Sequence, residues 1–526
     1  MDNNNEKNIH IKCQRNKISL LLISFYSGVI AISDLGVKYY LKDEQKLNTS
    51  TFSSILLIIK VAYLIKPIFG LLIDFFPIFG YKKKIYLLLC FIINIFCWYL
   101  FIFRKNDNLL ISLICQLFIN ITISFSTVIG SAIQVEISKL RDKQNTISTS
   151  TLNLMSQYFI VKSIGTLIPS FFKGFLVEKY SNDILFYISG VISILLLLSG
   201  LILDEDRISK KKNSKIVKKA SFTPLIKLQK KDIGNSKIES LINNKNYLIL
   251  LLLVIILESS PSCVSPLFYY ETNILGLNPK NLGLIDFTSS IAIIVFIYTY
   301  ENYISKYKYN FKTIIFCVRI LIFGSFSLIY LLITKSTQEY ISDFLLIAFA
   351  TSLYAGLHSL GQLPYNLICI KFSPFGLEAT SYSFCVFSCY LGNILADYID
   401  YLLAIYFNIT HHNFTDLGKL VFIENIINLI PLLYIWIIPK SFFSEKKRIS
   451  SATELSSLEK DKQENIKTAK TFDNKNKNND DIDEDNESII DDIINNIIGD
   501  NDIDDNIESN ELNIQPYQNS YRYLNY

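Results

Sequence analysis

Long apolar segments recur along this chain and constrain its fold more than any other feature. Runs of about 20 apolar residues, the length of a helix that crosses a bilayer, follow one another between Ile18 and Pro439. A soluble domain, whose core has a limited volume, has no use for such repeated runs. Because backbone groups in lipid must be bonded internally, each run is predicted to form a helix.

The hydropathy of the sequence predicts an all-α polytopic membrane protein with about twelve transmembrane helices. The predicted spans are residues 18–40, 52–73, 85–103, 109–137, 152–174, 183–203, 246–269, 282–302, 311–334, 342–370, 376–404 and 417–439. The first span continues too far for the apolar part of a signal peptide, so we expect it to be retained.

The polar segments separate these spans into two groups of six. We expect a cytoplasmic N-terminal tail, a six-helix bundle, a basic cytoplasmic linker, a second six-helix bundle and a disordered acidic, Asn-rich tail; the predicted ranges are 1–17, 18–203, 204–245, 246–440 and 441–526. The last segment is too polar to bury the apolar surface that folding requires.

The distribution of lysine and arginine predicts how the chain crosses the bilayer. Cations gather before the first span, in the loop at Lys82–Lys84 and near Lys139, whereas the alternate loops hold scattered ones such as Lys42 and Lys179. Since basic loops stay in the cytoplasm, both termini are expected there. No organelle leader is apparent, and the plasma membrane is therefore the expected location.

Sequence features of enzymes and metal proteins are missing. The nine cysteines have no paired loop spacing and include no CxxC, and the four histidines lack acidic partners at metal spacing. No nucleophile with an acid–base partner and no glycine-rich nucleotide loop occurs. We therefore expect neither an enzyme nor an ATP-driven pump, no metal, no cofactor and no nucleic-acid partner.

An internal repeat relates the two groups of spans. A Tyr-Tyr pair followed after six residues by Leu-Asn occurs in Tyr39–Asn48 and again 230 residues later in Tyr269–Asn278. The copies lie where the first and the seventh predicted spans leave the membrane. Parallel six-helix halves are the architecture of the major facilitator superfamily, in which the solute site lies at mid-membrane between the halves. The repeat argues against a channel or a receptor.

The segment between the second and third spans carries the most specific motif. Gly70 permits a close helix approach, Asp74 lies at a helix end, Gly80 suits a tight turn, and the lysines of 82–84 follow. The order resembles the Gly-x-x-x-Asp…Gly-Arg-Lys-Arg loop of major facilitators, lengthened by a Phe-Phe-Pro-Ile insert.

This lengthened loop and several other segments together resemble the folate–biopterin transporter family. The similar segments are Tyr39–Asp43, Lys66–Tyr81, Pro266–Gly283 and Pro364–Thr380, and the resemblance covers about residues 20–440. It implies a monomeric secondary carrier of folates, pterins or related aromatic anions that works by alternating access, with proton coupling as a further expectation. A major-facilitator carrier of a different small organic solute is the alternative, because a fold does not fix a function.

The chain departs from the family's pattern near the end of the fourth span. Glu136 matches a glutamate of the pattern, but Thr127 and Ser131 stand where relatives have aspartates. Two groups that could hold a proton or pair with a cation are therefore replaced. The replacement therefore affects two expectations that the resemblance implies, namely proton coupling and the identity of the substrate.

Charged residues within spans are costly and are therefore site candidates. The candidates for substrate contact are three cations, which suit a carboxylate, and two tyrosines, which suit an aromatic ring. They are Lys60, Lys162, Arg319, Tyr39 and Tyr269. The alternatives are ion pairing for the cations and anchoring at the membrane surface for the tyrosines.

Two further groups of candidates complete the predicted machinery. The candidates for proton coupling, or alternatively for structural ion pairs, are Asp34, Lys38, Glu258, Asp286 and Asp397. The candidates for gating and helix capping are Lys66, Gly70, Asp74, Gly80, Glu136 and Glu378. Asp34 and Lys38 are four residues apart, so they can pair on one helix face.

Overall fold

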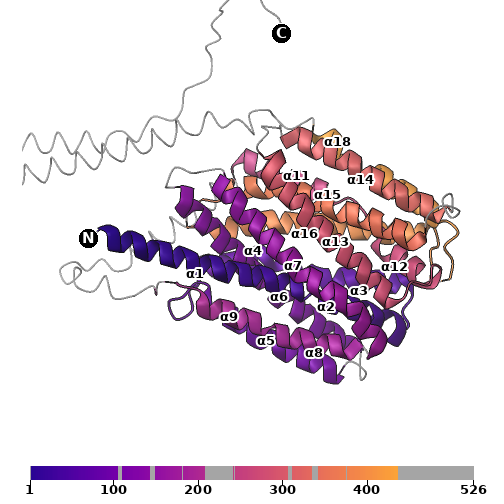
Figure 1. Cartoon of the computed structure of the whole chain (residues 1–526), viewed down its shortest axis with the longest axis horizontal. Helices are drawn as coiled ribbons and strands as arrows, with labels where there is room; N and C mark the ends of the chain where they lie inside the picture. Colours follow the sequence, from indigo (N-terminus) through magenta and orange to yellow (C-terminus); the bar gives the residue numbers. More distant parts are fainter. Residues whose placement is uncertain are drawn as a thin grey trace, which may run out of the picture. The chain divides into compact units, whose positions relative to one another are not determined.

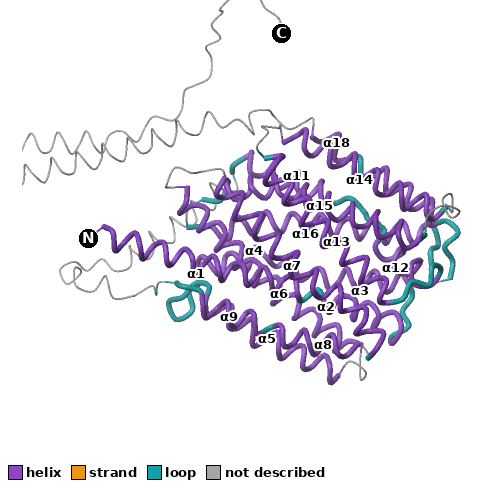
Figure 2. Tube along the Cα trace, viewed as in Figure 1, coloured by secondary structure: helices purple, strands orange, loops and turns teal. Residues whose placement is uncertain are grey.

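A computed structural model of the chain is a bundle of helices joined by short loops (Figures 1 and 2). It describes residues 2–104, 109–142, 149–180, 182–205, 207, 241, 243–305, 311–334, 342–374, 376–410 and 412–435. These ranges hold no strand, only a bridge between Ile78 and Tyr81. Most of the predicted basic linker and all of the predicted acidic tail lie outside the described residues.

The first half contains nine α-helices. They are α1 (Asp2–Val29), α2 (Ile32–Tyr39), α3 (Thr49–Val61), α4 (Lys66–Phe75), α5 (Lys84–Arg104), α6 (Leu109–Asp142), α7 (Thr149–Lys179), α8 (Asn182–Ile192) and α9 (Ile194–Ile202) within the described residues. A π-helical turn at Tyr40–Glu44 extends α2, and a 3-10 turn at Ala62–Ile65 joins α3 to α4.

The second half repeats this pattern. Its described helices are α11 (Lys245–Glu258), α12 (Val264–Asn273), α13 (Pro279–Thr299), α14 (Phe311–Ile333), α15 (Asp343–Phe372), α16 (Glu378–Tyr406), α17 (Leu417–Ile427) and α18 (Ile430–Ile435). A π-helical turn at Tyr300–Ile304 extends α13.

The helices account for the twelve predicted spans. Ten helical segments of the described chain are long and apolar enough to cross a membrane. The seventh span is split into α11 and α12, and the eleventh is α16, which has 29 residues but a more polar sequence. The protein is therefore an all-α, multi-pass membrane protein with two six-helix halves.

The span predicted at 246–269 is not one helix, which corrects the sequence-based expectation. Helix α11 ends at Glu258, and α12 begins only at Val264. Pro261 has no N–H group to donate and would clash with the preceding turn of a continuous helix. Cys263 adopts a left-handed φ of 53°. The break leaves backbone groups that other residues must satisfy, and Asn428 donates to the carbonyl of Pro261 at 3.3 Å.

The two copies of the Tyr-Tyr/Leu-Asn pattern fold into the same turn. The amide of Leu47 donates to the carbonyl six residues earlier at 3.2 Å, and the amide of Leu277 makes the corresponding bond at 3.0 Å. The residue before each is left-handed, with φ of 50° at Lys46 and 62° at Gly276. Because the copies match in backbone as well as in sequence, they are equivalent points of two related halves.

Two long helix contacts join the halves. Helix α7 packs along α13, which lies beside it in Figure 1, and α3 and α4 pack along α16. Each contact pairs the second span of one half with the fifth span of the other, as a two-fold relation between the halves requires. All nine cysteines are free thiols.

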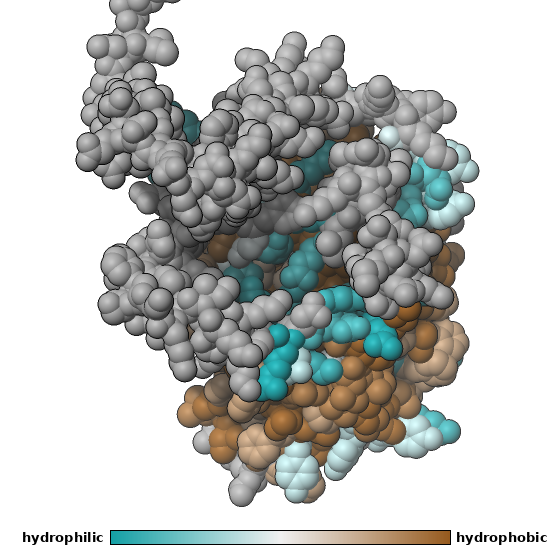
Figure 3. Space-filling view, turned by 90° about the vertical axis from the view of Figure 1, so that its left-hand side faces the viewer, coloured by the Kyte–Doolittle hydropathy of each residue, from teal (hydrophilic) through white to brown (hydrophobic). Residues whose placement is uncertain are grey.

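We call the end of the bundle that carries Lys82–Lys84 and Lys139 the basic end. Figure 3 faces this end: hydrophilic residues gather near its middle, and a hydrophobic flank lies below them. Large apolar side chains such as Phe96, Tyr99 and Val191 are exposed on the helices of that flank. A surface of this kind suits contact with lipid tails.

Candidate functional site

Two neighbouring cavities lie among helices of both halves. The larger has a volume of about 240 Å³, and Lys38 and Leu35 of α2 face it from the first half. The smaller has a volume of about 90 Å³, and Lys60 of α3 faces it from the first half. Ser262, Val264 and Tyr354 line both. The break between α11 and α12 therefore separates the two spaces.

The larger cavity combines charged and aromatic side chains. Phe268 and Glu271 of α12 and Asp286 of α13 line it, together with Lys38. The ammonium group of Lys38 lies 5.3 Å from the centre of the Phe268 ring, a cation–π contact. Asp286 pairs with Lys173 of α7, which joins the halves across the cavity wall.

Asp34 and Lys38 do not form a direct ion pair, which the sequence left open as an alternative. None of the described ion pairs joins them, although both lie on α2 and interact electrostatically. Lys38 contacts the ring of Phe268 instead. The side chain of Asp34 is exposed and lies within electrostatic reach of Lys60 and Lys173.

Lys60 forms an ion pair across the halves. Its Nζ lies 2.5 Å from Oδ2 of Asp397 on α16, and 42% of its side chain is exposed, against 22% for Asp397. Both residues line the smaller cavity. Lys60 therefore has the ion pair that the sequence left open as an alternative. It also remains accessible from the smaller cavity.

A second charged cluster lies on the other wall of the smaller cavity. Arg319 of α14 donates to Oγ of Ser260 at 2.9 Å and to the carbonyl of Leu257 at the end of α11. Glu258 accepts from the hydroxyl of Tyr365 at 2.6 Å and lies 3.1 Å from Nε2 of His358. The guanidinium group thus satisfies a helix end that the break has exposed, and the carboxylate is held by polar partners.

Lys66 and Lys162 have no carboxylate partner within the described structure. Lys66, only 2% exposed, donates to Oγ1 of Thr127 at 3.0 Å and lies 4.3 Å from the ring centre of Tyr390. Lys162 lies within electrostatic reach of Lys66, and no described ion pair contains either. Thr127 thus occupies the position from which an aspartate would neutralise Lys66.

Asp74 closes the basic end by capping a helix of the other half. Its Oδ2 accepts from the amide of Thr380 at 2.8 Å and from the hydroxyl of Thr380 at 2.7 Å, at the start of α16. The first amides of a helix have no partner within it, and the helix dipole favours a carboxylate there. Asp74 therefore links the halves.

Glycines allow this close approach. A Cβ atom at Gly70 would meet the Ala379 carbonyl at 2.8 Å and Cα of Thr380 at 2.9 Å. Gly80 has φ of 85° in the tight turn where Ile78 and Tyr81 exchange backbone hydrogen bonds. Both glycines have the backbone roles that the sequence predicted.

Ion pairs surround the same end. Glu378 lies 3.0 Å from Nζ of Lys139, a second link between the halves, and Glu136 pairs with Lys83. The carboxylate of Glu205 accepts from the backbone amides of residues 82, 83 and 84 at 2.7, 3.0 and 3.2 Å. This network fixes the loop that follows Gly80.

Tyrosines join the halves at the opposite end. The hydroxyl of Tyr269 donates to the carbonyl of Leu47 at 2.8 Å, and its ring meets Phe52 edge-on at 5.3 Å. Tyr39 packs edge-on against Phe268 at 5.8 Å. Neither tyrosine is among the residues that line the two cavities, so the structure places both in contacts between the halves.

Sequence reasoning missed several charged partners. Lys139, Lys173 and Glu205 were not singled out because they lie at the ends of predicted spans, where a charged residue is ordinary. Glu271 was missed for the same reason, yet it is 8% exposed and lines the larger cavity. Only the internal repeat could have drawn attention to it, since Glu271 directly follows the second Tyr-Tyr pair.

Removing the cap at the basic end should destabilise the contact between the halves. Asp74→Ala is expected to lower the free energy of unfolding by about 2 kcal/mol, the upper range for loss of a helix N-cap. Asp74→Asn keeps an acceptor and should cost less. Thermal unfolding of the purified protein in nanodiscs measures both. Equal melting temperatures for the wild type and Asp74→Ala would contradict the capping role.

Known proteins of similar sequence are membrane carriers. "Folate transporter 1" of Plasmodium falciparum (isolate 3D7) is 29% identical over 445 residues, which cover 82% of this chain and 81% of that protein. "Folate-biopterin transporter" of a Synechocystis species is 24% identical over 429 residues, which cover 80% of this chain and 81% of that protein.

Solved structures with the same fold are also carriers. The nucleoside transporter NupG has a TM-score of 0.54 at 15% identity, with 82% of this chain and 100% of that chain covered. A D-xylose-proton symporter has a TM-score of 0.57 at 15% identity, with 82% and 98% covered. At such low identity these neighbours show the fold alone, which is that of the major facilitator superfamily.

The family model agrees with the sequence relatives and extends over both halves. It matches residues 27–456, which include every helix from α2 to α18 and both cavities. The relatives are named as transporters rather than as enzymes. The chain therefore belongs to the BT1 family.

Proposed function

We propose that this protein is a secondary carrier of folates, pterins or related aromatic anions that works by alternating access. The observation that carries the proposal is the pair of cavities between the halves, whose walls combine cations, carboxylates and aromatic rings. The names of the relatives, folate and folate-biopterin transporters, supply the substrate class.

The smaller cavity offers a place for the carboxylate of such an anion. Arg319 and Lys60 line it from opposite halves. The described contacts of Arg319 use its Nη1 and Nη2 atoms, and a guanidinium group has five N–H donors. A carboxylate that reached Lys60 would compete with Asp397 for it. Binding of an anion could therefore weaken the Lys60–Asp397 pair, which joins the halves.

The aromatic part of the substrate has matching surfaces nearby. Tyr354 lines both cavities and stacks on His358 with 5.8 Å between ring centres. Phe268 presents its ring to the larger cavity. Flat heteroaromatic rings pack well against such side chains. We assign the ring system to the larger cavity and the acidic end to the smaller one.

Alternating access needs contacts that break at one end while they form at the other. The basic end is joined through Asp74 and Glu378, and the opposite end through Tyr269 and Leu47. We assign the predicted gating residues, Lys66, Gly70, Asp74, Gly80, Glu136 and Glu378, to the first of these gates. Tyr39 and Tyr269 belong to the second gate.

We also propose an oligomeric state, a membrane, an orientation and the residues for proton coupling. The carrier is monomeric, lies in the plasma membrane and has both termini in the cytoplasm, as the lysine-rich loops favour. Proton coupling is assigned to the carboxylates that face the cavities, Glu258, Glu271, Asp286 and Asp397, with Asp34 close to them. Ionisable side chains of this kind within membrane spans form the proton relays of many carriers.

Uptake into vesicles tests the proposal. The purified protein is reconstituted into liposomes, and entry of radiolabelled folate and para-aminobenzoate is followed with and without a pH gradient, inside alkaline. We expect uptake that saturates and that an acidic exterior accelerates. A carrier that moves neither solute above the level of empty liposomes would overturn the assigned substrate class.

A carrier of a different small organic solute is the second candidate. The observation that favours it is the replacement of two aspartates of the family pattern by Thr127 and Ser131. Thr127 contacts Lys66, so the replacement changes the charge of the central region. A screen of nucleosides, sugars and organic acids in the same vesicles would identify such a solute.

Restoring a carboxylate beside Lys66 should weaken binding of anions. Thr127→Asp places a negative charge at the atom that Lys66 now contacts at 3.0 Å. We expect KM for the anionic substrate to rise at least about 10-fold, which is about 1.4 kcal/mol and less than a charge pair at this distance can supply. Thr127→Asn is the neutral control. Equal KM values for the two variants would exclude a direct electrostatic role of Lys66.

A further inference from the structure

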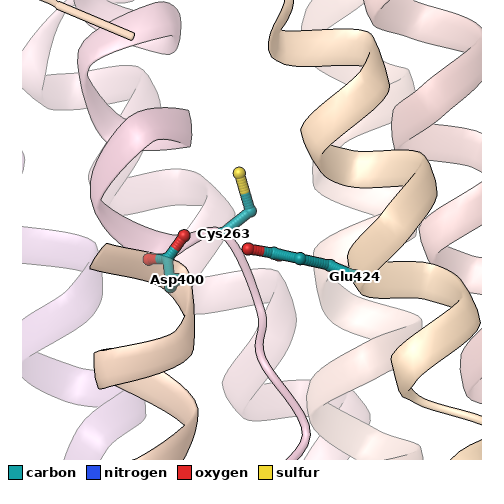
Figure 4. A group of neighbouring side chains, drawn as sticks. All are labelled: Cys263, Asp400 and Glu424. Carbon is teal, nitrogen blue, oxygen red and sulfur yellow. The ribbon is translucent and has the colours of Figure 1, made fainter. Parts of the chain in front are cut away.

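Three buried side chains from separate segments meet beside the break in the seventh span. Cys263 precedes α12, Asp400 lies on α16 and Glu424 on α17. The two carboxylates point toward each other, with the Cys263 side chain beside them (Figure 4). They are 1%, 5% and 0% exposed, respectively. The sulfur atom and one carboxylate oxygen from each acid all lie within 4.8 Å of one another.

The two acids face each other with few other partners. In the described structure, no hydrogen bond of good geometry reaches either Oε atom of Glu424 or Oδ1 of Asp400, although the two carboxyl groups lie close enough to share a proton and the backbone at Cys263 and Ser265 lies near them. No described ion pair includes either acid. Removing an ionised carboxylate from water costs several kcal/mol, and two neighbouring ones also repel each other. Either a bound cation or a proton shared between the two carboxyl groups must offset this cost.

We propose that Cys263, Asp400 and Glu424 bind one divalent metal cation of the zinc class. Two charges on the cation neutralise the two carboxylates. A thiolate ligand favours zinc over magnesium and calcium, which take six or more oxygen ligands. Three protein ligands with one open position are common around zinc. The thiol releases its proton to the medium when the Zn–S bond forms.

The position of the site links the cation to the solute cavity. Asp400 lies one helical turn from Asp397, which lines the smaller cavity and pairs with Lys60. The neighbours of Cys263 in the chain, Ser262 and Val264, line both cavities. In carriers with discontinuous helices, ions bind where the helix is unwound. The cation would hold the start of α12 to α16 and α17 and so fix the wall between the cavities.

Metal binding to the purified full-length protein tests the proposal without reference to transport. The protein in nanodiscs is stripped with a chelator and dialysed against ⁶⁵Zn²⁺, and Cd²⁺ is added separately to record the ultraviolet absorption of a Cd–thiolate bond. The variants are Glu424→Gln and Cys263→Ser. The matched controls are Glu178→Gln and Cys317→Ser, which replace an exposed acid and an exposed thiol.

We expect one tightly bound zinc ion per chain in the wild type and in both controls. Glu424→Gln should weaken zinc binding at least 100-fold, and Cys263→Ser should weaken it at least 10-fold and abolish the cadmium–thiolate band. The proposal fails if the wild type binds no zinc, which would leave the two acids sharing a proton. It also fails if either cluster variant binds like its control. Should a variant not fold, the stoichiometry and cadmium band of the wild type still decide.

Discussion

Replacing Arg319 by glutamine should lower the initial rate of substrate uptake at least about 100-fold, because two hydrogen bonds from a charged donor are lost, each contributing about 1.5–3 kcal/mol. The guanidinium group holds Ser260 and the carbonyl of Leu257, at the point where α11 ends. It also faces the smaller cavity, where an anionic substrate would meet it. Glutamine cannot supply the charge, and it removes the arginine that lies within electrostatic reach of Glu258.

A lysine at position 319 tests whether uptake needs the charge of Arg319 or the geometry of its donors. Arg319→Lys keeps the positive charge but not the planar fork of donors, so we expect intermediate uptake with KM raised more than kcat is lowered. Lys179→Gln, at the exposed end of α7, is the control for loss of a cation elsewhere. Thermal unfolding of each variant in nanodiscs shows whether the bundle is intact. Wild-type uptake by Arg319→Gln would remove Arg319 from the solute site.

The sequence was sufficient to predict the membrane-spanning architecture, because hydropathy and internal backbone bonding act over each span separately. The twelve spans, their division into two halves and the roles of Gly70 and Gly80 follow from local rules of this kind. The internal repeat went further, since a pattern of four residues predicted equivalent turns that share a backbone hydrogen bond and a left-handed residue. The helix break was missed because the apolar residues on both sides of Pro261 together have the length of one span, although residues 258–262 between them are polar.

The partners of the charged residues could not be predicted in the same way. Asp34 and Lys38 are adjacent on one helix face, yet Lys38 contacts Phe268, which is 230 residues away in the sequence. Lys60 and Asp397 were both candidates, but nothing in the sequence pairs them. Such contacts depend on how the halves dock, and no local pattern encodes that docking. The Cys263–Asp400–Glu424 cluster is an extreme case, since its residues have no common motif.

The geometry suggests why the charges are arranged in pairs across the halves. Lys60–Asp397 and Lys173–Asp286 each join a helix of one half to a helix of the other, and each pair has at least one partner that lines a cavity. An ion pair between two helices is strong in a low-dielectric region. A bound anion or a proton can nevertheless take the place of one partner. Among the described residues, no carboxylate pairs with Lys66 or Lys162.

Residues larger than glycine should be poorly tolerated where α1 and α7 approach each other. A Cβ atom at Gly165 would lie 2.7 Å from the carbonyl of Phe25 and 3.2 Å from Cα of Gly28. Both neighbours are backbone atoms, which cannot rotate away as side chains do. Close backbone approach through small residues is a principal source of helix association in membranes, where lipid tails remove the hydrophobic driving force.

We therefore expect Gly165→Val to lower the free energy of unfolding by about 3 kcal/mol or more. This loss is at least as large as that of ordinary overpacking, because the two helices must separate along their length. The measurement is the melting temperature of the purified protein in nanodiscs, together with the yield of monodisperse protein. Gly324→Val on α14 is the matched control, since a Cβ atom there meets nothing within 4 Å. If both variants melt at the wild-type temperature, α1 and α7 do not depend on this contact; if both fall equally, the loss reflects valine in a helix rather than the approach of two backbones.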